Sequence, residues 1–472
     1  MTRILKPFYL RERLTLFLIA LLPLHAFLVT VLTKLIAGKG HAPLPWIAVW
    51  KEGMLAVILL LIIFETISSG KKFLRFDLLD WLIAALLVLG VAVTAFTHAD
   101  WKLALLGFRY DFVPLVAFLI ARRTEWSAWF RERALMVLLG VGVLIAAYGI
   151  LTVFLPIPFF RWLGYAPAHS LYFADGPVAA FQQVSDTALR RIQSTMSGPN
   201  QFGLWLLVPF GILLSRWGRG RGTLEYWNNR TFKYWMSGVL LLGALFLTFS
   251  RAAWIGAFVM SMVVLLRSVP HRYLKCAAIG AISIVASISI VASVLFPSVF
   301  FRLSSSRGHL VRPLQAVTRM WDHPVGEGLG AAGPASNRVS ETCVFLRPQD
   351  DPSWAKTTPR LCVFLGTTQV QPMDHACRCP FLPENWYLQI GVEMGVAGFT
   401  LFLVLVVVVL RRLGAQYAVR STQYDAANGA VLLAFLGIAV ASLFLHAWED
   451  SATAYTLWLL AATQSSLLFR RA

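Results

Sequence analysis

Long apolar runs with few charges recur along the whole chain. A helix of about 20 apolar residues crosses the roughly 30 Å hydrocarbon core of a bilayer. Of the 472 residues, 58% are hydrophobic and 14% are charged, whereas soluble proteins average about 45–50% and about 25%. This pattern predicts an all-α, polytopic membrane protein and excludes a soluble enzyme, a small disulfide-stabilised protein and a disordered tail. About 12 transmembrane helices are expected, near residues 14–36, 47–66, 77–96, 102–121, 134–155, 200–216, 234–249, 252–267, 274–297, 385–410, 427–446 and 452–469.

The basic residues are distributed unevenly between the two sets of connections. Lys and Arg number 42 and Asp and Glu number 23, so the formal net charge is +19. One set of connections holds most of these cations, and the opposite short turns hold only Lys34, Lys39, Lys51 and Lys102. Because Lys and Arg concentrate in cytoplasmic loops, both termini are expected in the cytoplasm. Their scatter over many segments, rather than along one stripe, argues against nucleic acid as a partner.

Two connections on the opposite, external side are long, at residues 156–199 and 298–384. Loops longer than about 12–15 residues are usually functional or disordered. Neither segment is polar low-complexity sequence, so we expect ordered structure in both. The N-terminal apolar run is too long for the core of a signal peptide, so we expect an uncleaved first span. Without an internal repeat, residues 1–472 are expected to form a single membrane domain.

The second external loop is rich in cysteine. Four cysteines in an oxidising compartment predict two disulfides with three possible connectivities, and pairing of the two closely spaced cysteines with the two earlier ones is favoured. Asp374 and His375 lie close by and raise the alternative of a metal site, but the cysteine spacing lacks the two-to-four-residue gap typical of zinc sites. No metal is therefore expected. The four residues are Cys343, Cys362, Cys377 and Cys379.

The same loop contains an amphipathic pattern followed by a glycine-rich segment. Apolar residues recur at helical spacing between Leu310 and Trp321, and Arg312 and Arg319 occupy another face. This pattern predicts a helix lying at the membrane surface. The segment from Gly326 to Gly330 alternates glycine with other residues, but no preceding strand and following helix are expected, so a tight turn is favoured over a dinucleotide site.

Three places put arginine within or beside an apolar run, where charge is costly and often functional. Arg109 lies two residues before Asp111 in the fourth expected span, and an ion pair with Asp111 or with another helix is the structural alternative to substrate binding. Arg190 and Arg191 lie in the first external loop, and Arg251 lies at an external turn. The alternative for these external arginines is a snorkelling role at the interface.

Arg191 and Arg251 are suited to grip a diphosphate, because guanidinium groups offer paired N–H donors to phosphate oxygens. Glu384 immediately precedes the span at 385–410. It is a candidate catalytic carboxylate, and its structural alternative is an acid stabilised at a helix N-terminus, a contribution of about 0.3–1 kcal/mol.

Four segments, in this order, resemble the O-antigen ligase and O-antigen polymerase superfamily of bacterial envelope glycosyltransferases. Arg191-Ile-Gln-Ser-Thr-Met-Ser-Gly-Pro-Asn200 is similar to that family's Arg-then-Pro-Asn element, and Phe249-Ser-Arg251-Ala-Ala-Trp is similar to its Ser-Arg turn. Asp322-His-Pro-Val-Gly-Glu-Gly-Leu-Gly330 resembles its Pro-x-Gly-x-Gly-x-Gly segment. The ligases carry His, then Asn, Ser or Gln, then nine residues and Gly-x-x-Gly. Asn385, Gly395 and Gly398 fit this spacing, and Glu384 occupies the His position.

The resemblance covers roughly residues 100–470 and implies transfer of a glycan from undecaprenyl diphosphate to an acceptor hydroxyl on the periplasmic side of the bacterial inner (cytoplasmic) membrane. It implies an inverting, metal-independent reaction without cofactor, with the loop at 298–384 forming a periplasmic subdomain. Glu384, Arg191 and Arg251 are the expected catalytic residues. The expected substrate-binding residues are Arg190, Asn200, Arg109, His309 and Asn385.

The missing histidine argues against a typical ligase that uses lipid A-core as acceptor, so a polysaccharide polymerase acting on a second lipid-linked repeat is favoured. A carboxylate near two arginines has a weaker pull on a proton, and His309 is an alternative base or a surface histidine. A transporter or flippase for an anionic glycolipid would explain Arg109 and Asp111 without catalysis. A scaffold in an envelope-assembly complex would leave Arg191, Arg251 and Glu384 uncoupled.

Overall fold

The computed structural model describes residues 7–68, 76–167, 177–184, 189–217, 229–268, 273, 276, 280, 303–346, 348–357, 361–418 and 425–465. The protein is mostly helical. The expected span at 274–297 lies almost wholly outside the described residues. The described helices are α1 (Pro7–Leu21), η1 (Leu22–Leu24), α2 (His25–Ala37), α3 (Pro45–Ala48), α4 (Trp50–Ser68), α5 (Leu78–Phe96), α6 (Trp101–Asp111), α7 (Val113–Ala121), α8 (Ala128–Leu151), α9 (Ile157–Leu163), α10 (Pro199–Trp217), α11 (Asn229–Leu247), α12 (Arg251–Ser268), α15 (Leu303–Asp322), α16 (Gly333–Val339), η3 (Ser353–Thr357), α17 (Trp386–Ala418), α18 (Asp425–Ala441) and α19 (Ser451–Ser465).

Five helical stretches in the described part of the chain are long and apolar enough to cross a membrane. A sixth is formed if α6 and α7, bent by 43° relative to one another, count as one span. The chain is therefore a membrane protein, as the sequence predicts. The five stretches are Tyr9–Ala37, Pro45–Ser68, Leu78–Phe96, Ala128–Leu151 and Trp386–Ala415.

The number of spans stays a prediction. The other expected spans within the described residues are also helical, as α10, α11, α12, α18 and α19, but these helices have 15 to 19 residues. α19, with 15 residues, is shorter than the range of about 17–25 residues that crosses the hydrocarbon core, and the other four helices lie at the lower end of that range. The structure therefore supports five or six spans directly and leaves twelve unconfirmed.

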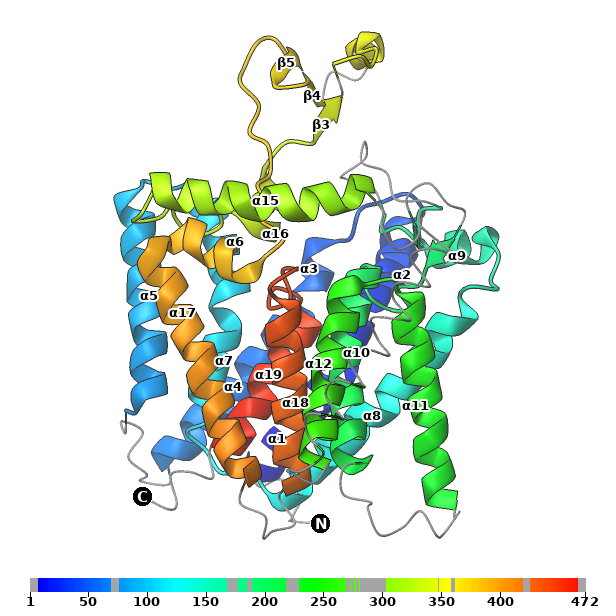
Figure 1. Cartoon of the computed structure of the whole chain (residues 1–472), viewed down its shortest axis with the longest axis vertical. Coiled ribbons are helices and arrows are strands. Elements are labelled where there is room, and N and C mark those ends of the chain that lie inside the picture. Colours follow the sequence, from blue (N-terminus) through cyan, green and yellow to red (C-terminus); the bar gives the residue numbers. More distant parts are fainter. Residues whose placement is uncertain are drawn as a thin grey trace.

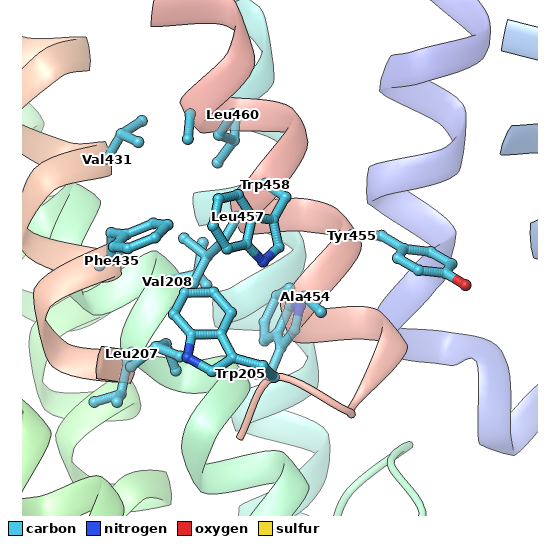
Figure 2. Packing of buried hydrophobic residues seen from close by; sticks show 14 of the residues in the cluster. Trp205, Leu207, Val208, Val431, Phe435, Ala454, Tyr455, Leu457, Trp458 and Leu460 are labelled. Carbon is cyan, nitrogen blue, oxygen red and sulfur yellow. The ribbon is translucent and has the colours of Figure 1, made fainter. Parts of the chain in front are cut away.

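The core of the bundle is built around α10, which packs against α18, α12 and α8. Nearly every side chain of α10 is buried, including Trp205, Leu207 and Val208. Figure 2 shows these residues packed with Phe435 of α18 and with residues of α19 such as Trp458. By contrast, α4 and α5 expose large apolar side chains on their outer faces. A surface of this kind is suited to lipid rather than water.

One end of the bundle is covered by α15, which lies across the ends of the other helices (Figure 1). We call this end the α15 end. α15 confirms the helix expected between Leu310 and Trp321. α1 begins and α19 ends at the opposite end of the bundle (Figure 1).

A small sheet projects beyond α15 (Figure 1). Its strands are β3 (Cys343–Leu346), β4 (Cys362–Leu365) and β5 (Thr368–Gln371), in the order β3-β4-β5. β3 and β4 are parallel and β4 and β5 are antiparallel. Two disulfides, Cys343–Cys379 and Cys362–Cys377, crosslink this region. We call the segment from Cys343 to Cys379 the disulfide subdomain. Of the three connectivities that the sequence leaves open, the structure has this one, in which both late cysteines pair with the two earlier ones.

The glycine-rich segment that follows α15 is threaded between α6 and a break in α17. Within α17, Met394 and Gly395 leave helical geometry, with Gly395 at φ 68°. The segment fills the break, since the Val396 N–H donates to the Pro324 carbonyl (3.1 Å) and the Glu327 N–H to the Val392 carbonyl (2.9 Å). A Cβ on Gly395 would lie 2.1 Å from the Pro324 oxygen. The segment forms tight turns, as predicted, and its glycines serve close backbone packing.

Candidate functional site

Five charged or titratable side chains gather beneath α15. They come from four separate parts of the chain. His309 and Arg312 belong to α15, Glu384 precedes α17, Arg251 begins α12, and Arg191 lies in β2 (Arg190–Arg191). The His309 imidazole interacts electrostatically with all four of the other groups. The structure thus brings together Glu384, Arg191 and Arg251, the three residues expected to be catalytic, with His309, the expected substrate-binding residue or alternative base, and it adds Arg312.

Glu384 is held by its side chain. Its Oε1 accepts a hydrogen bond from Arg312 Nη1 (2.5 Å), and its Oε2 lies 3.8 Å from His309 Nδ1. Its backbone φ is +55°, a left-handed conformation that is uncommon for residues other than glycine. Glu384 therefore does not simply occupy the first turn of α17. It sits one residue before the helix cap, turned towards α15.

His309 titrates under opposing influences. Burial lowers its pKa most, Glu384 raises it, and the cations Arg251, Arg312 and Arg191 lower it further, so that the net pKa lies below the ordinary value of 6.5. The imidazole is therefore neutral near pH 7, with a free nitrogen lone pair. A neutral imidazole next to a carboxylate can accept a proton.

Arg191 and Arg251 are brought together by the turn between α11 and α12. Arg191 donates from Nε to the Thr248 carbonyl (3.0 Å) and from Nη2 to Asn200 Oδ1 (2.7 Å). The Ile192 N–H donates to the Leu247 carbonyl (3.2 Å), which fastens the chain after β2 to the end of α11. Arg251 lies three residues after Thr248, directly after this turn. Asn200 thus orients the Arg191 guanidinium, and its expected contact with substrate stays a prediction.

Arg190 and Asn385 have structural roles in the described geometry. Arg190 donates to the Leu155 carbonyl (3.2 Å) and stacks over Phe181, 4.5 Å from the ring centroid. The Asn385 Oδ1 accepts from the Leu388 N–H (3.0 Å), so Asn385 is the N-cap of α17. The expected binding of substrate by these two residues stays a prediction.

Arg109 lies outside the cluster beneath α15. Its guanidinium pairs with Glu52 Oε1 of α4 at 2.6 and 2.9 Å. Asp111 is instead buried beside Glu393 of α17. Of the two structural partners considered for Arg109, the structure has the other helix and not Asp111.

Asp374 and His375, weighed with the cysteines as a metal site, form a different arrangement. His375 lies between two carboxylates, with Nε2 2.8 Å from Glu341 Oε1 and Nδ1 2.9 Å from Asp374 Oδ1. These hydrogen bonds raise the pKa of His375 above 6.5. In the described part of the chain, one group has donor atoms close enough for a metal, Glu341, Cys362 and Cys377, and both of its sulfurs are joined in a disulfide.

Sequence reasoning missed His446, Gln389 and Glu449, which connect to Glu384 from its backbone side. The Glu384 N–H donates to His446 Nε2 (3.3 Å), His446 Nδ1 lies 2.6 Å from Gln389 Oε1, and Gln389 Nε2 donates to Glu449 Oε1 (2.7 Å). The only signal in the sequence is the change from apolar to polar residues at His446-Ala-Trp-Glu449-Asp450, where an expected span ends.

The chain matches no known protein-family model and no curated protein sequence. Three guanidinium groups, one neutral imidazole and one carboxylate at the end of a membrane bundle can bind a phosphate-bearing ligand and accept a proton beside it.

Proposed function

We propose that the chain is a membrane glycosyltransferase that transfers or polymerises glycan repeat units carried on undecaprenyl diphosphate. The observation that carries this proposal is the convergence of Arg191, Arg251 and Glu384 with His309 beneath α15. Residues far apart in the sequence, singled out for a diphosphate donor and for an acceptor hydroxyl, share one site. A scaffold would have no use for this convergence.

The cations and the base have separate roles in the reaction. The acceptor hydroxyl oxygen attacks the anomeric carbon of the donor glycan, and the bond from that carbon to the diphosphate oxygen breaks. Negative charge develops on the departing lipid diphosphate, and Arg191 and Arg251 supply fixed N–H donors that stabilise this charge. The hydroxyl proton passes to a base in the site. Attack from the face opposite to the diphosphate inverts the anomeric centre, and these steps draw on no cofactor.

Glu384 and His309 share the task of the base. The carboxylate is held in a charge-assisted hydrogen bond with Arg312, which weakens its pull on a proton. His309 is neutral and lies beside it, so the proton can be taken by the imidazole while Glu384 orients the hydroxyl and stabilises the imidazolium that forms. General base catalysis of this kind contributes typically 10²–10⁴-fold.

The orientation of the molecule fits a reaction on the periplasmic face of the bacterial inner membrane. The disulfide subdomain projects at the α15 end (Figure 1), and disulfides persist in oxidising compartments. The site lies at the same end, and α1 begins and α19 ends at the opposite end, in accord with cytoplasmic termini. Membrane lipids and an acceptor glycan or glycolipid are the remaining partners.

A polymerase is favoured over an O-antigen ligase because Glu384 occupies the position of the ligase histidine. The test uses purified protein and one lipid-diphosphate-linked repeat unit, with no other acceptor, and resolves the products by size on a gel. A ladder of longer lipid-linked glycans supports a polymerase. If no ladder forms, lipid A-core is added, and transfer to it identifies a ligase.

A transporter or flippase for an anionic glycolipid is the second candidate function. It is favoured by Asp111 and Glu393, two buried carboxyl groups from different candidate spans. Intramembrane carboxyl groups often mark ion or proton pathways. Movement of an intact lipid-linked glycan across reconstituted vesicles, without any change in its size, would support this function against the transferase.

A further inference from the structure

Residues 384–386 are bound to the loop between α18 and α19 by three hydrogen bonds, two from backbone N–H groups and one from a side chain. The Trp386 N–H donates to the Ser442 carbonyl (2.9 Å), and Asn385 Nδ2 donates to the Leu443 carbonyl (3.0 Å). The third bond runs from the Glu384 N–H to His446 Nε2. It is the one that acts on Glu384 itself, and it joins residues 62 positions apart.

The direction of this third bond fixes the tautomer of His446. A backbone N–H can only donate, so Nε2 of His446 must be the acceptor. The neutral imidazole then carries its proton on Nδ1, which faces Gln389 Oε1 at 2.6 Å. Gln389 is fully buried, and its remaining N–H group donates to Glu449. In this series of hydrogen bonds, each atom of His446 and Gln389 is either a donor or an acceptor. The other tautomer of His446, or a flipped Gln389 amide, would leave two donors facing each other.

Glu384 needs such a support because its conformation is unfavourable. A residue other than glycine in the left-handed region is strained, and it persists there when its surroundings hold it in place. The Glu384 backbone N–H is bonded to His446, and its side-chain carboxylate is bonded to Arg312. The first fixes where the Cα lies, and the second fixes where the carboxylate points.

We infer that His446 is a positioning residue, which holds Glu384 in its left-handed conformation and thereby sets the carboxylate against His309. Gln389 and Glu449 keep His446 in the tautomer that can do so. The effect of His446 on catalysis rests on the proposed transferase function. The hydrogen bond between Glu384 and His446 is independent of that function.

Two substitutions at residue 446 separate this role from a general role in packing. In His446→Gln, the amide oxygen can take the place of Nε2 and accept from the Glu384 N–H. In His446→Asn, the shorter amide can take the place of Nδ1 and donate to Gln389, but nothing reaches Glu384. Both variants are polar amides of similar size, so a packing role predicts similar effects from the two.

The experiment uses the full chain in lipid nanodiscs and measures two quantities. Hydrogen exchange at the Glu384 amide is expected to accelerate about tenfold or more in His446→Asn and to stay near the wild-type rate in His446→Gln. In the transfer assay, His446→Asn is expected to lower kcat by about 10- to 100-fold with little change in KM, because a misplacement of about 1 Å at a reacting group can cost on the order of 10²-fold. His446→Gln is expected to retain most of kcat.

Equal exchange at the Glu384 amide in both variants would overturn the inference. Faster exchange in His446→Asn together with an unchanged kcat would also overturn it, because the bond would then exist without positioning a catalytic group. If the wild-type protein transfers no glycan, the proposed function fails, and the exchange measurement still decides whether His446 holds Glu384.

Discussion

Glu384→Gln is expected to remove glycan transfer while leaving the fold intact. The substitution keeps the shape of the side chain and removes its negative charge. In the structure this charge faces Arg312 at 2.5 Å, and the exposed fractions of the two side chains are 47% for Arg312 and 17% for Glu384. The change therefore touches one partly exposed ion pair and one candidate catalytic group, and the magnitudes of these two effects differ.

The effect on stability is small and the effect on rate is large. A solvent-exposed ion pair contributes about 0.2–1 kcal/mol to the free energy of unfolding, and a neutral amide keeps part of the hydrogen bond. Loss of a general base or of the group that orients the nucleophile costs about 10²–10⁴-fold in rate. At about 1.36 kcal/mol for each factor of ten, this is about 2.7–5.4 kcal/mol in the activation barrier.

The assay compares initial rates of glycan transfer with thermal unfolding of the same detergent-purified samples. Glu327→Gln is a matched control, because Glu327 pairs at 2.7 Å with Arg319, which lies in α15 as Arg312 does. The exposed fractions of the two side chains are 19% for Glu327 and 41% for Arg319. Glu327→Gln is expected to alter stability as little as Glu384→Gln does and to leave the rate unchanged. A full rate in Glu384→Gln, or an equal loss of rate in both variants, would refute the assigned role of Glu384.

Three further outcomes are expected. Arg251→Ala should abolish transfer without changing membrane insertion or abundance, whereas Arg190→Ala, outside the cluster, should keep measurable transfer; equal rates in both would remove Arg251 from the mechanism. Gly395→Ala should prevent accumulation of folded protein, because its Cβ would lie 2.1 Å from a backbone oxygen, and Gly414→Ala in the same helix, with no atom within 4 Å, should be tolerated. His375 should titrate by NMR with a midpoint above 6.5, so its stabilising charge is present below pH 6.5 and is lost as the pH rises through the raised pKa; a midpoint at or below 6.5 would contradict the hydrogen-bonded arrangement.

The helices of this fold are readable from the sequence because long apolar runs admit few alternatives. The expected spans that became α4, α5 and α8 each hold a continuous apolar run, and such a run in lipid must be helical to satisfy its backbone. The depth of α10, α18 and α19 within the bundle is not readable in this way. Helix faces that pack against other helices and helix faces that contact lipid are both made of apolar residues, so the sequence does not show which helices lie inside the bundle.

The site was predictable in part. Arg191, Arg251 and Glu384 carry local patterns at the ends of apolar runs, but their proximity depends on how the bundle folds. The sequence left Asp111 and another helix open as partners of Arg109, and the structure has the other helix because residues two apart on a helix do not face each other. His446 acts through a backbone N–H 62 residues away, and no spacing in a single sequence encodes such a contact.

The disulfide subdomain has a consequence for how this protein can vary. The Cα atoms of Cys343 and Cys379 lie 5.6 Å apart, so the chain leaves the bundle and returns to it at nearly the same point. The segment between these two cysteines is an insertion whose ends are joined by the Cys343–Cys379 disulfide and whose interior is crosslinked by the Cys362–Cys377 disulfide. Its length and surface can diverge, or it can be exchanged for a short turn, without moving either end of the segment that leads from α15 to Glu384. The surface that this insertion presents can therefore change while the geometry of the residues beneath α15 stays constant.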